Sequence, residues 1–336
     1  MSSIRIKSEK VAVYHVYTRI VHKRRLLADV QREVWVAALR RAALFSGVEL
    51  ITYCAMQTHA HILVRVDPAA RQCGDAELVA RFGALYGRSR AAWCRLNARE
   101  LAAVLAQGET SRADELRERL RSRMGDISEF MRTLKQRYTK WFNHTYETEG
   151  TLWAERFGSV LVQDDASIVA LVAAYIDLNP VRAGLADLPE DYRWCGYAAA
   201  MGGDGELRAS LAKCRPGEGG EAGGLARYRL LMLGKGAAKK RDGAGGRIDP
   251  AALEEALASG GELPVHELLR LRLGFMTRGR ALGREEWLTE GDGARVLGRL
   301  PKPPGTARVE IVVGMPLATA NARAAGGAEA PGAGQE

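Results

Sequence analysis

The chain has 336 residues, a length that corresponds to one large domain or two smaller ones. Hydrophobic residues make up 47% of it, enough for a packed core, so disorder throughout is excluded. Lys and Arg number 49 against 40 Asp and Glu, and the formal charge of +9 favours a polyanionic partner such as nucleic acid. The charge does not require such a partner, because GC-rich coding also enriches Arg, Ala and Gly.

Cysteine usage and hydropathy restrict the compartment. The five cysteines are scattered and form no Cys-x-x-Cys pair, which argues against a zinc ribbon and against a disulfide framework. The first residues are charged and lack the apolar region of a signal peptide, and no stretch approaches the roughly 18 apolar residues of a membrane span. We therefore expect a soluble, cytoplasmic and nucleoid-associated protein without a membrane partner.

The first part of the chain predicts a strand, a helix and two further strands. Residues 11–18 (VAVYHVYT) are β-branched and aromatic, as is typical of a strand. Residues 30–45 have helical apolar spacing, and Gly47 follows as a stop signal. Residues 48–56 and 59–66 predict two strands, and the short link between them predicts an antiparallel hairpin.

The middle of the chain is predominantly helical in pattern. Residues 71–126 contain Arg-rich helical segments, which we expect to form an insertion. The helix predicted over 128–142 carries its apolar residues at spacings of three and four, so one face is hydrophobic. Residues 158–162 predict a fourth strand, and 166–178 predict a helix that Asn179-Pro180 ends.

The composition changes after residue 200. Gly-rich stretches predict a linker over 201–248, and helical spacing returns in 249–317. The last segment, 318–336, is rich in Ala and Gly and is expected to be disordered. We therefore predict one domain over 1–200, followed by the linker, a helical extension and the tail.

The first chemical motif is His59-Ala60-His61 in a predicted strand. Side chains alternate between the two faces of a strand, so the two imidazoles lie on the same face. This geometry suits two nitrogens that converge on one metal ion. The alternative is that both are surface histidines without a role.

The second motif is the pair of Tyr175 and Asn179. These residues are four apart and share one face of a helix. The amide oxygen of Asn179 can complete a metal site that contains two histidines, and the Tyr175 hydroxyl can lie beside it. The alternative is that Tyr175 packs in the core while Asn179-Pro180 forms a turn that ends the helix.

The third motif is the segment 150–159 (GTLWAERFGS). Trp153 and Arg156 lie among small residues, and an aromatic ring beside an arginine can stack on a base and contact a phosphate. A turn with a buried tryptophan is the alternative interpretation.

Taken in order, five segments resemble the REP-associated tyrosine transposases, which belong to the single-tyrosine HUH transposase and nuclease superfamily. The segments are residues 14–16 (YHV), 56–64 (MQTHAHILV), 150–157 (GTLWAERF), 175–184 (YIDLNPVRAG) and 189–197 (PEDYRWCGY). The resemblance covers about residues 8–200. It departs from the family at Asp177, where the family often has histidine, and in the long segment 71–126.

The resemblance implies an α+β fold: a ferredoxin-like core with a central antiparallel sheet and helices packed on one side, plus a helical insertion and a C-terminal helical extension. It implies that His59 and His61 are the metal-binding pair and that Asn179 is the third ligand of Mg²⁺ or Mn²⁺. Tyr175 would be the nucleophile that forms a 5′-phosphotyrosine and releases a 3′-OH.

The implied substrate is single-stranded DNA beside a small hairpin. The side chains expected to contact it are the cations and the aromatic ring of the motifs: Arg137, Lys140, Trp153, Arg156 and Arg182. Relatives with one tyrosine per chain work as monomers or as dimers, so a homodimer is one of two open states.

Three function classes compete. The first is a DNA-nicking and rejoining enzyme, the second a domesticated binder of structured single-stranded DNA that does not cut, and the third a metal-dependent hydrolase that uses water. Tyr138 is a competing tyrosine, but Tyr175 is favoured because Asn179 accompanies it at helical spacing. The sequence contains no G-x-x-x-x-G-K-[ST] loop, which argues against an NTPase helicase.

Overall fold

The structure is a computed structural model. It describes residues 6–21, 27–87, 89–108, 110–216, 218–233, 277, 279–298, 306–309 and 317–320.

The core is an α+β arrangement with the element order of a ferredoxin-like fold. The elements are β1 (Ala12–Arg19), α1 (Asp29–Ser46), β2 (Val48–Ala55), β3 (His59–Val66), α5 (Ile127–Tyr146) and β4 (Gly158–Val162). The strand order is β2-β3-β1-β4, and each neighbouring pair is antiparallel. The predicted fold class, with its hairpin and antiparallel central sheet, is therefore confirmed.

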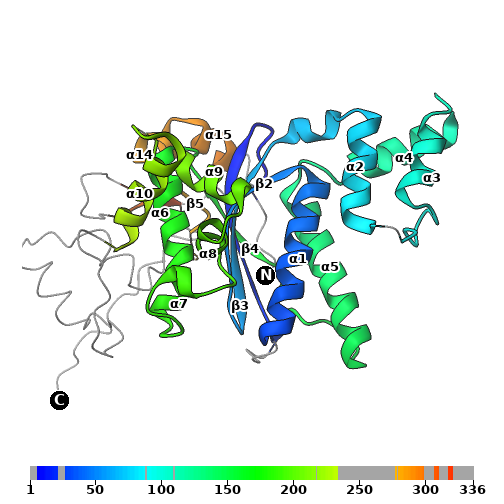
Figure 1. Ribbon diagram of the computed structural model, residues 1–336. Helices are drawn as coiled ribbons and strands as arrows, with labels where there is room; N and C mark the ends of the chain where they lie inside the picture. The colour runs from blue at the N-terminus through cyan, green and yellow to red at the C-terminus, as the bar shows by residue number, and fades with distance from the viewer. Residues whose placement is uncertain are drawn as a thin grey trace, which may run out of the picture.

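Helices cover both faces of this sheet, and not one face alone. On one face lie α1 and α5, and on the other lies a second group of helices, as Figure 1 shows. This second group consists of α6 (Ala166–Asp177), α7 (Asn179–Arg182), η3 (Pro189–Asp191), α8 (Gly196–Met201), α9 (Gly205–Lys213) and α10 (Gly220–Leu233). Central strands between two helical layers are buried on both faces. Accordingly, the consecutive residues Val13, Tyr14 and His15 of β1 are all buried.

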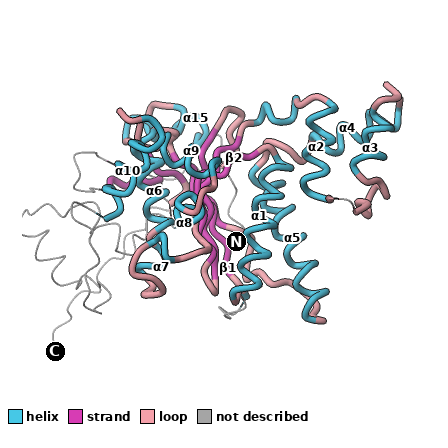
Figure 2. The backbone as a smooth tube through the Cα atoms, in the orientation of Figure 1, coloured by secondary structure: helices cyan, strands magenta, loops and turns pink. Residues whose placement is uncertain are grey.

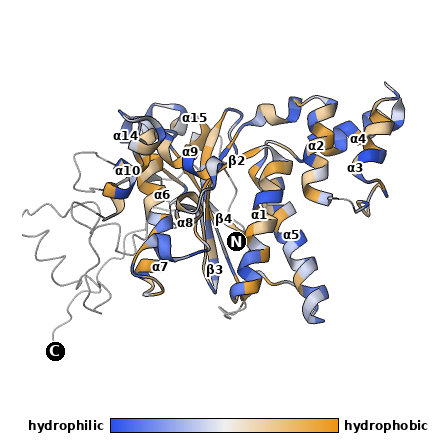
Figure 3. Ribbon diagram, in the orientation of Figure 1, coloured by the Kyte–Doolittle hydropathy of each residue, from blue (hydrophilic) through white to orange (hydrophobic). Residues whose placement is uncertain are grey.

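Hydrophobicity follows this layering. The central strands and α6 are mainly hydrophobic, whereas the helices farthest from the sheet carry more hydrophilic residues (Figure 3). In Figure 2 the strands form a thin layer between the two sets of helices. Helix α6 is buried all round, because the sheet lies on one side of it and α9 and α10 pack against it from others.

The Arg-rich insertion folds on its own small core. It comprises η2 (Pro68–Gln72), α2 (Asp75–Tyr86), α3 (Ala98–Leu105) and α4 (Ser111–Arg121). Their apolar side chains form a cluster separate from the main core, joined to α1 through Phe45. The insertion extends on the α1 side of the sheet (Figure 1).

The Gly-rich region after residue 200 is not a linker where the structure describes it. Helices α9 and α10 lie within the predicted linker 201–248, and Leu211 and Tyr228 are buried in the main core. The glycines serve close packing: a Cβ at Gly224 would lie 2.6 Å from the carbonyl oxygen of Ala212. The prediction of a domain boundary near residue 200 therefore does not hold, because glycine content alone cannot distinguish a loop from a tight helix contact.

The described part of the C-terminal region extends the sheet. It contains β5 (Ala281–Gly283), α14 (Glu285–Thr289), α15 (Asp292–Gly298), β6 (Thr306–Val309) and β7 (Leu317–Ala320). Strand β5 pairs in parallel with β4, and the seven strands have the order β2-β3-β1-β4-β5-β7-β6. The extension predicted as helical thus also supplies strands, and β7 reaches into the predicted disordered tail. The remainder of both segments lies outside the described residues.

Within the ranges that the structure describes, every helix is too short or too polar to cross a membrane.

Candidate active site and nucleic-acid interface

The two predicted histidines lie side by side at the start of β3. His59 and His61 project from the same face, their ring centroids are 5.2 Å apart, and their ring planes are nearly perpendicular. His61 is buried and His59 is half-buried. The alternation of side chains along the strand therefore places the pair as the sequence indicates.

A third histidine completes a cluster with them; it lies in segment 14–16 of the resemblance, but the sequence analysis assigned it no site role. His15 lies on β1, which pairs directly with β3, and its Nε2 is 2.9 Å from Nδ1 of His61. Its ring is only 1% exposed. We call His15, His59 and His61 the histidine cluster. The alternation of side chains along β1 indicates which residues of that strand share a face with His15. Only the register in which β1 pairs with β3 places His15 against His61.

Both histidines of β3 have Nδ1 within hydrogen-bonding distance of a partner. His61 Nδ1 faces His15, and His59 Nδ1 lies 2.9 Å from the hydroxyl oxygen of Thr58. In a neutral imidazole one nitrogen carries the proton and the other keeps a lone pair. With the Nδ1 proton donated to such a partner, Nε2 of each ring can bind a cation.

Tyr175 lies against the same cluster. Helix α6 crosses this face of the sheet, and the Tyr175 ring centroid is 6.2 Å from that of His15 and 6.3 Å from that of His61, edge-on to both. The side chain is 6% exposed. Asp165 caps the start of α6 by accepting hydrogen bonds from two backbone amides, which helps to define where the helix begins. The structure therefore brings the predicted nucleophile and His61 together.

Asn179 begins α7, directly after α6 ends. Its amide nitrogen donates to the main-chain oxygens of Tyr175 and Ile176, at 3.4 and 3.2 Å. These bonds commit the nitrogen to the end of α6. The amide oxygen, which is the end that can ligate a cation, consequently points away from those carbonyls.

The donor set fits an open metal site more readily than a closed one. Within the described residues, no three His, Cys, Asp or Glu side chains are placed to hold a metal ion together. A cation at this site would be coordinated by imidazole nitrogens and an amide oxygen. Mg²⁺ and Mn²⁺ prefer oxygen ligands, so phosphate oxygens and water would have to fill the remaining positions.

Positive charge surrounds the cluster. Burial, the neighbouring histidines and the guanidinium groups of Arg182 and Arg19 hold the pKa of His61 well below its ordinary value of 6.5. The ring is therefore neutral near pH 7 and keeps a lone pair. Arg182, a predicted DNA contact, lies 4.1 Å above the centre of the Tyr175 ring and donates to the Tyr175 main-chain oxygen at 2.6 Å.

A second tyrosine also reaches the cluster. The ring centroid of Tyr17 on β1 is 6.3 Å from that of His61, as close as that of Tyr175. It lies over Gly158 of β4, where any Cβ would collide with it. Burial raises the pKa of Tyr17. The sequence motifs did not indicate Tyr17, because its proximity comes from its pairing with His61 across two strands.

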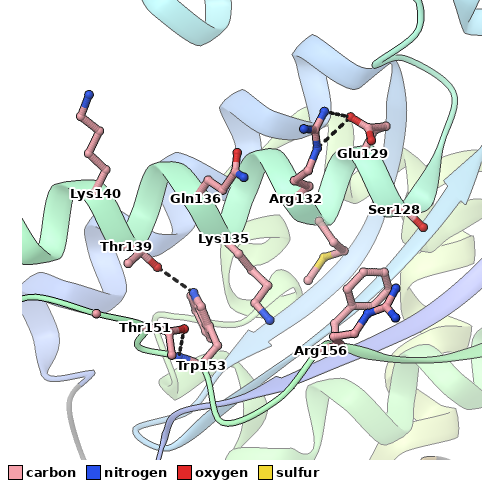
Figure 4. Close-up of a pocket in the computed structure, with 13 residues that line it drawn as sticks. Ser128, Glu129, Arg132, Lys135, Gln136, Thr139, Lys140, Thr151, Trp153 and Arg156 are labelled. Carbon is pink, nitrogen blue, oxygen red and sulfur yellow. Dashed lines mark hydrogen bonds and ion pairs between the residues drawn. The ribbon is translucent and has the colours of Figure 1, made fainter. Parts of the chain in front are cut away.

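A cationic groove lies between α5 and residues 150–157. Its volume is about 680 Å³, and Lys140, Trp153 and Arg156 from the predicted DNA contacts line it, together with Arg132 and Lys135 (Figure 4). We call it the α5 groove. Trp153 is held by a hydrogen bond from its ring nitrogen to the Thr139 hydroxyl at 2.9 Å. Lys135 lies 5.3 Å above the tryptophan ring.

The α5 groove and the histidine cluster occur at the same end of the sheet. Trp153 forms a bridge with Ile20, and the amide of Ala154 donates to the carbonyl of Arg19 at 3.0 Å. Arg19 in turn pairs with His59 across β1 and β3. One short stretch of backbone therefore links the groove to the first histidine of the motif.

Arg137 lies apart from the other predicted DNA contacts. It is half-buried, with its guanidinium 5.0 Å from the centre of the Tyr86 ring of the insertion, and it does not line the α5 groove. Burial, together with the charges of Arg41 and Arg123, lowers its pKa. Residues 137 and 140 are three apart and are therefore neighbours on the surface of α5, so the contact of Arg137 with Tyr86, and not helical periodicity, sets the two side chains apart.

The competing tyrosine, Tyr138, is a packing residue. It is buried among aromatic side chains, and its hydroxyl donates to the main-chain oxygen of Gln31 at 3.1 Å. Burial raises its pKa.

Asp177, the departure from the family pattern, points away from Tyr175. Its carboxylate accepts hydrogen bonds from Thr52 at 2.6 Å and Tyr228 at 2.7 Å, and from the backbone amide of Tyr197 at 3.3 Å. It is completely buried, and this burial raises its pKa to about 7. Asp177 thus joins α6 to β2, α8 and α10, so its role is structural.

Comparisons with known proteins give a distant likeness. No protein-family model and no curated protein matches the chain. Among solved structures, the chain is similar to a REP-associated tyrosine transposase bound to a REP hairpin, with 14% sequence identity and a TM-score of 0.37. The match covers 60% of this chain and 87% of that one.

Proposed function

We propose that this protein is a metal-dependent endonuclease and strand transferase that acts on single-stranded DNA, with Tyr175 as its nucleophile. The observation that carries the proposal is the approach of the Tyr175 ring to His15 and His61, at 6.2 and 6.3 Å, across the junction of α6 and the sheet. All these groups belong to one chain, so a monomer would contain the complete set.

The protein residues have separate tasks at the phosphodiester. His59, His61 and Asn179 would hold the cation, which when bound withdraws charge from the phosphate and orients it. Arg182 and Arg19 bring positive charge to the same place, which attracts the anionic substrate. Packing and the adjacent Arg182 position the Tyr175 ring.

The reaction is a transfer of the phosphoryl group between two oxygens. The Tyr175 oxygen forms a bond to phosphorus, the bond from phosphorus to the 3′ oxygen breaks, and the phenol proton passes through water to that oxygen. The products are a 5′-phosphotyrosine and a free 3′-OH. Because the new ester retains the energy of the broken one, a second 3′-OH can displace Tyr175 without ATP.

The α5 groove would bind the strand. Lys140 and Arg156 supply charge for phosphates, and Trp153 supplies an aromatic ring beside them. The sequence resemblance suggests that the strand flanks a hairpin.

The test is adduct formation with a labelled hairpin oligonucleotide that has single-stranded flanks, in the presence of Mn²⁺. We expect a protein–DNA adduct that survives denaturation and is lost in Tyr175→Phe. Tyr17→Phe is the matched control, since it removes the other hydroxyl at the cluster, and it should retain the adduct. Loss in Tyr17→Phe alone would assign the nucleophile to Tyr17. Free cleavage that persists in Tyr175→Phe would identify a hydrolase that uses water.

The burial of Tyr175 favours a second candidate. Tyr175 is 6% exposed and lies beneath Arg182. The second candidate is therefore a protein that binds structured single-stranded DNA without cutting it. Retarded DNA with neither adduct nor cleavage products would support this binding function.

A further inference from the structure

His15 is a buried polar group that the proposed reaction does not use. Its ring is 1% exposed, and it lies among the rings of Tyr17, His61 and Tyr175. An imidazole in the interior is costly unless its nitrogens are hydrogen-bonded. The contact between His15 Nε2 and His61 Nδ1, at 2.9 Å, lies within ordinary hydrogen-bonding distance.

The direction of this hydrogen bond decides what His61 can do. If His15 Nε2 donated, the Nδ1 lone pair of His61 would be used, its proton would reside on Nε2, and neutral His61 could not bind a cation through Nε2. If His61 Nδ1 donates to His15 Nε2, the Nε2 of His61 keeps its lone pair. Only the second arrangement is compatible with His61 as a metal ligand.

We propose that His15 is a positioning residue that accepts the Nδ1 proton of His61 and thereby holds the His61 ring with its Nε2 lone pair directed to the cation. This inference rests on the proposed function for the existence of that cation.

The two histidines of β3 differ in how they are held. Thr58, on the connection before β3, faces His59 with a hydroxyl that can both rotate and donate. His15 faces His61 with a buried ring on the neighbouring strand, and the ring centroids of Tyr17 and Tyr175 each lie 6.2 Å from that of His15. A neutral imidazole protonated on Nδ1 can only accept at Nε2. In that tautomer His15 fixes the proton of its partner on Nδ1, whereas a hydroxyl can either accept from its partner or donate to it.

The experiment compares His15→Phe with His15→Gln in the full chain. Phenylalanine keeps a buried ring but removes the acceptor, whereas the side-chain oxygen of glutamine can reach a similar place and accept. The first measurement is Mn²⁺ affinity by electron paramagnetic resonance without DNA. We expect His15→Phe to weaken binding about 10- to 100-fold and His15→Gln to stay within about 3-fold of the wild type. Thermal unfolding of each variant gives the structural control.

A second measurement needs no metal. Long-range ¹⁵N–¹H NMR spectra of histidine-labelled protein distinguish the two tautomers, and we expect His61 to carry its proton on Nδ1. In His15→Phe the population with the proton on Nε2 should rise.

Contrary outcomes are distinct. Wild-type affinity in His15→Phe, or a His61 proton on Nε2 in the wild type, would overturn the positioning role. Equal losses in both variants, with equally lowered unfolding temperatures, would make His15 a packing residue and would also overturn it. If the wild type binds no Mn²⁺ and His61→Ala changes nothing, the metal centre of the proposed function fails, and the inference fails with it.

Discussion

The histidine cluster lies in the interior, whereas the α5 groove lies on the surface, although both occur where β1 ends and β3 begins. Hydrogen bonds and aromatic contacts hold the rings of the cluster, in which His15 and His61 are buried and His59 is half-buried. The groove carries long cationic side chains, and several of its lining residues are exposed. Chemistry requires atoms fixed to within a fraction of an ångström, while phosphate binding tolerates mobile charges.

This difference between the histidine cluster and the α5 groove predicts that separate mutations impair DNA cleavage and DNA binding. His59→Ala removes a proposed ligand and should slow adduct formation by at least about a thousand-fold. DNA affinity should change by less than about threefold, because in the proposed function the α5 groove would supply most of the phosphate contacts. Single-turnover adduct formation and gel retardation measure the two quantities. Parallel losses of both would show that the two regions do not divide the work.

Substitutions in the α5 groove should have the opposite effect: they should weaken DNA binding and leave the rate of adduct formation unchanged. The double variant Lys140→Ala, Arg156→Ala should weaken single-stranded DNA binding about tenfold and reduce the salt dependence by about 1.4 in log–log slope. The adduct rate at saturating DNA should stay the same. Arg132→Ala is the matched control, because Arg132 is already paired with Glu129 and should have a smaller effect. A fall in the saturated rate would show that the groove also positions the phosphate for reaction.

Asp177 tests how the position of α6 is maintained. Burial raises the pKa of Asp177 to about 7 from the ordinary 3.8. Between these two pH values the folded state keeps a proton on Asp177 that the unfolded state has lost. Stability from this group is therefore complete below about pH 4 and decreases as the pH rises through 7. We expect the free energy of unfolding to fall by about 1 kcal/mol between pH 6 and pH 8 because of this group.

Chemical denaturation across that pH interval measures this effect, with Asp177→Asn as the comparison. The asparagine variant should be less stable at low pH, because one carboxyl oxygen is replaced, but its stability should lose this part of the pH dependence. An identical pH profile in both proteins would mean that Asp177 does not titrate there.

Arg137 should show the smallest effect. It lies outside the α5 groove and its guanidinium stacks on Tyr86, so Arg137→Gln should reduce DNA affinity by no more than about twofold. Gel retardation at two salt concentrations checks this value. A loss as large as that of the groove double variant would extend the DNA path onto the insertion.

Local patterns were sufficient to predict strands β1 to β4 and helices α1, α5 and α6. The hairpin of β2 and β3 and the shared face of His59 and His61 follow from strand periodicity and a short turn, which are local properties. The same reasoning from local patterns predicted a linker in the Gly-rich region after residue 200, where the structure has helices α9 and α10. Gly224 allows α10 to approach α9 closely, and this reason depends on a partner helix that no local window contains.

The sequence by itself determined the residue types, the spacing of the motif and the face on which two imidazoles must lie. The tertiary structure decided which distant groups meet them: His15 through the register of β1 on β3, Tyr17 through the space above Gly158, and Tyr175 through the course of α6. It also separated Arg137 from Lys140. The physical reason is that periodicity specifies the direction of a side chain within one element, whereas strand register and helix packing, set by burial of the whole core, specify its neighbours.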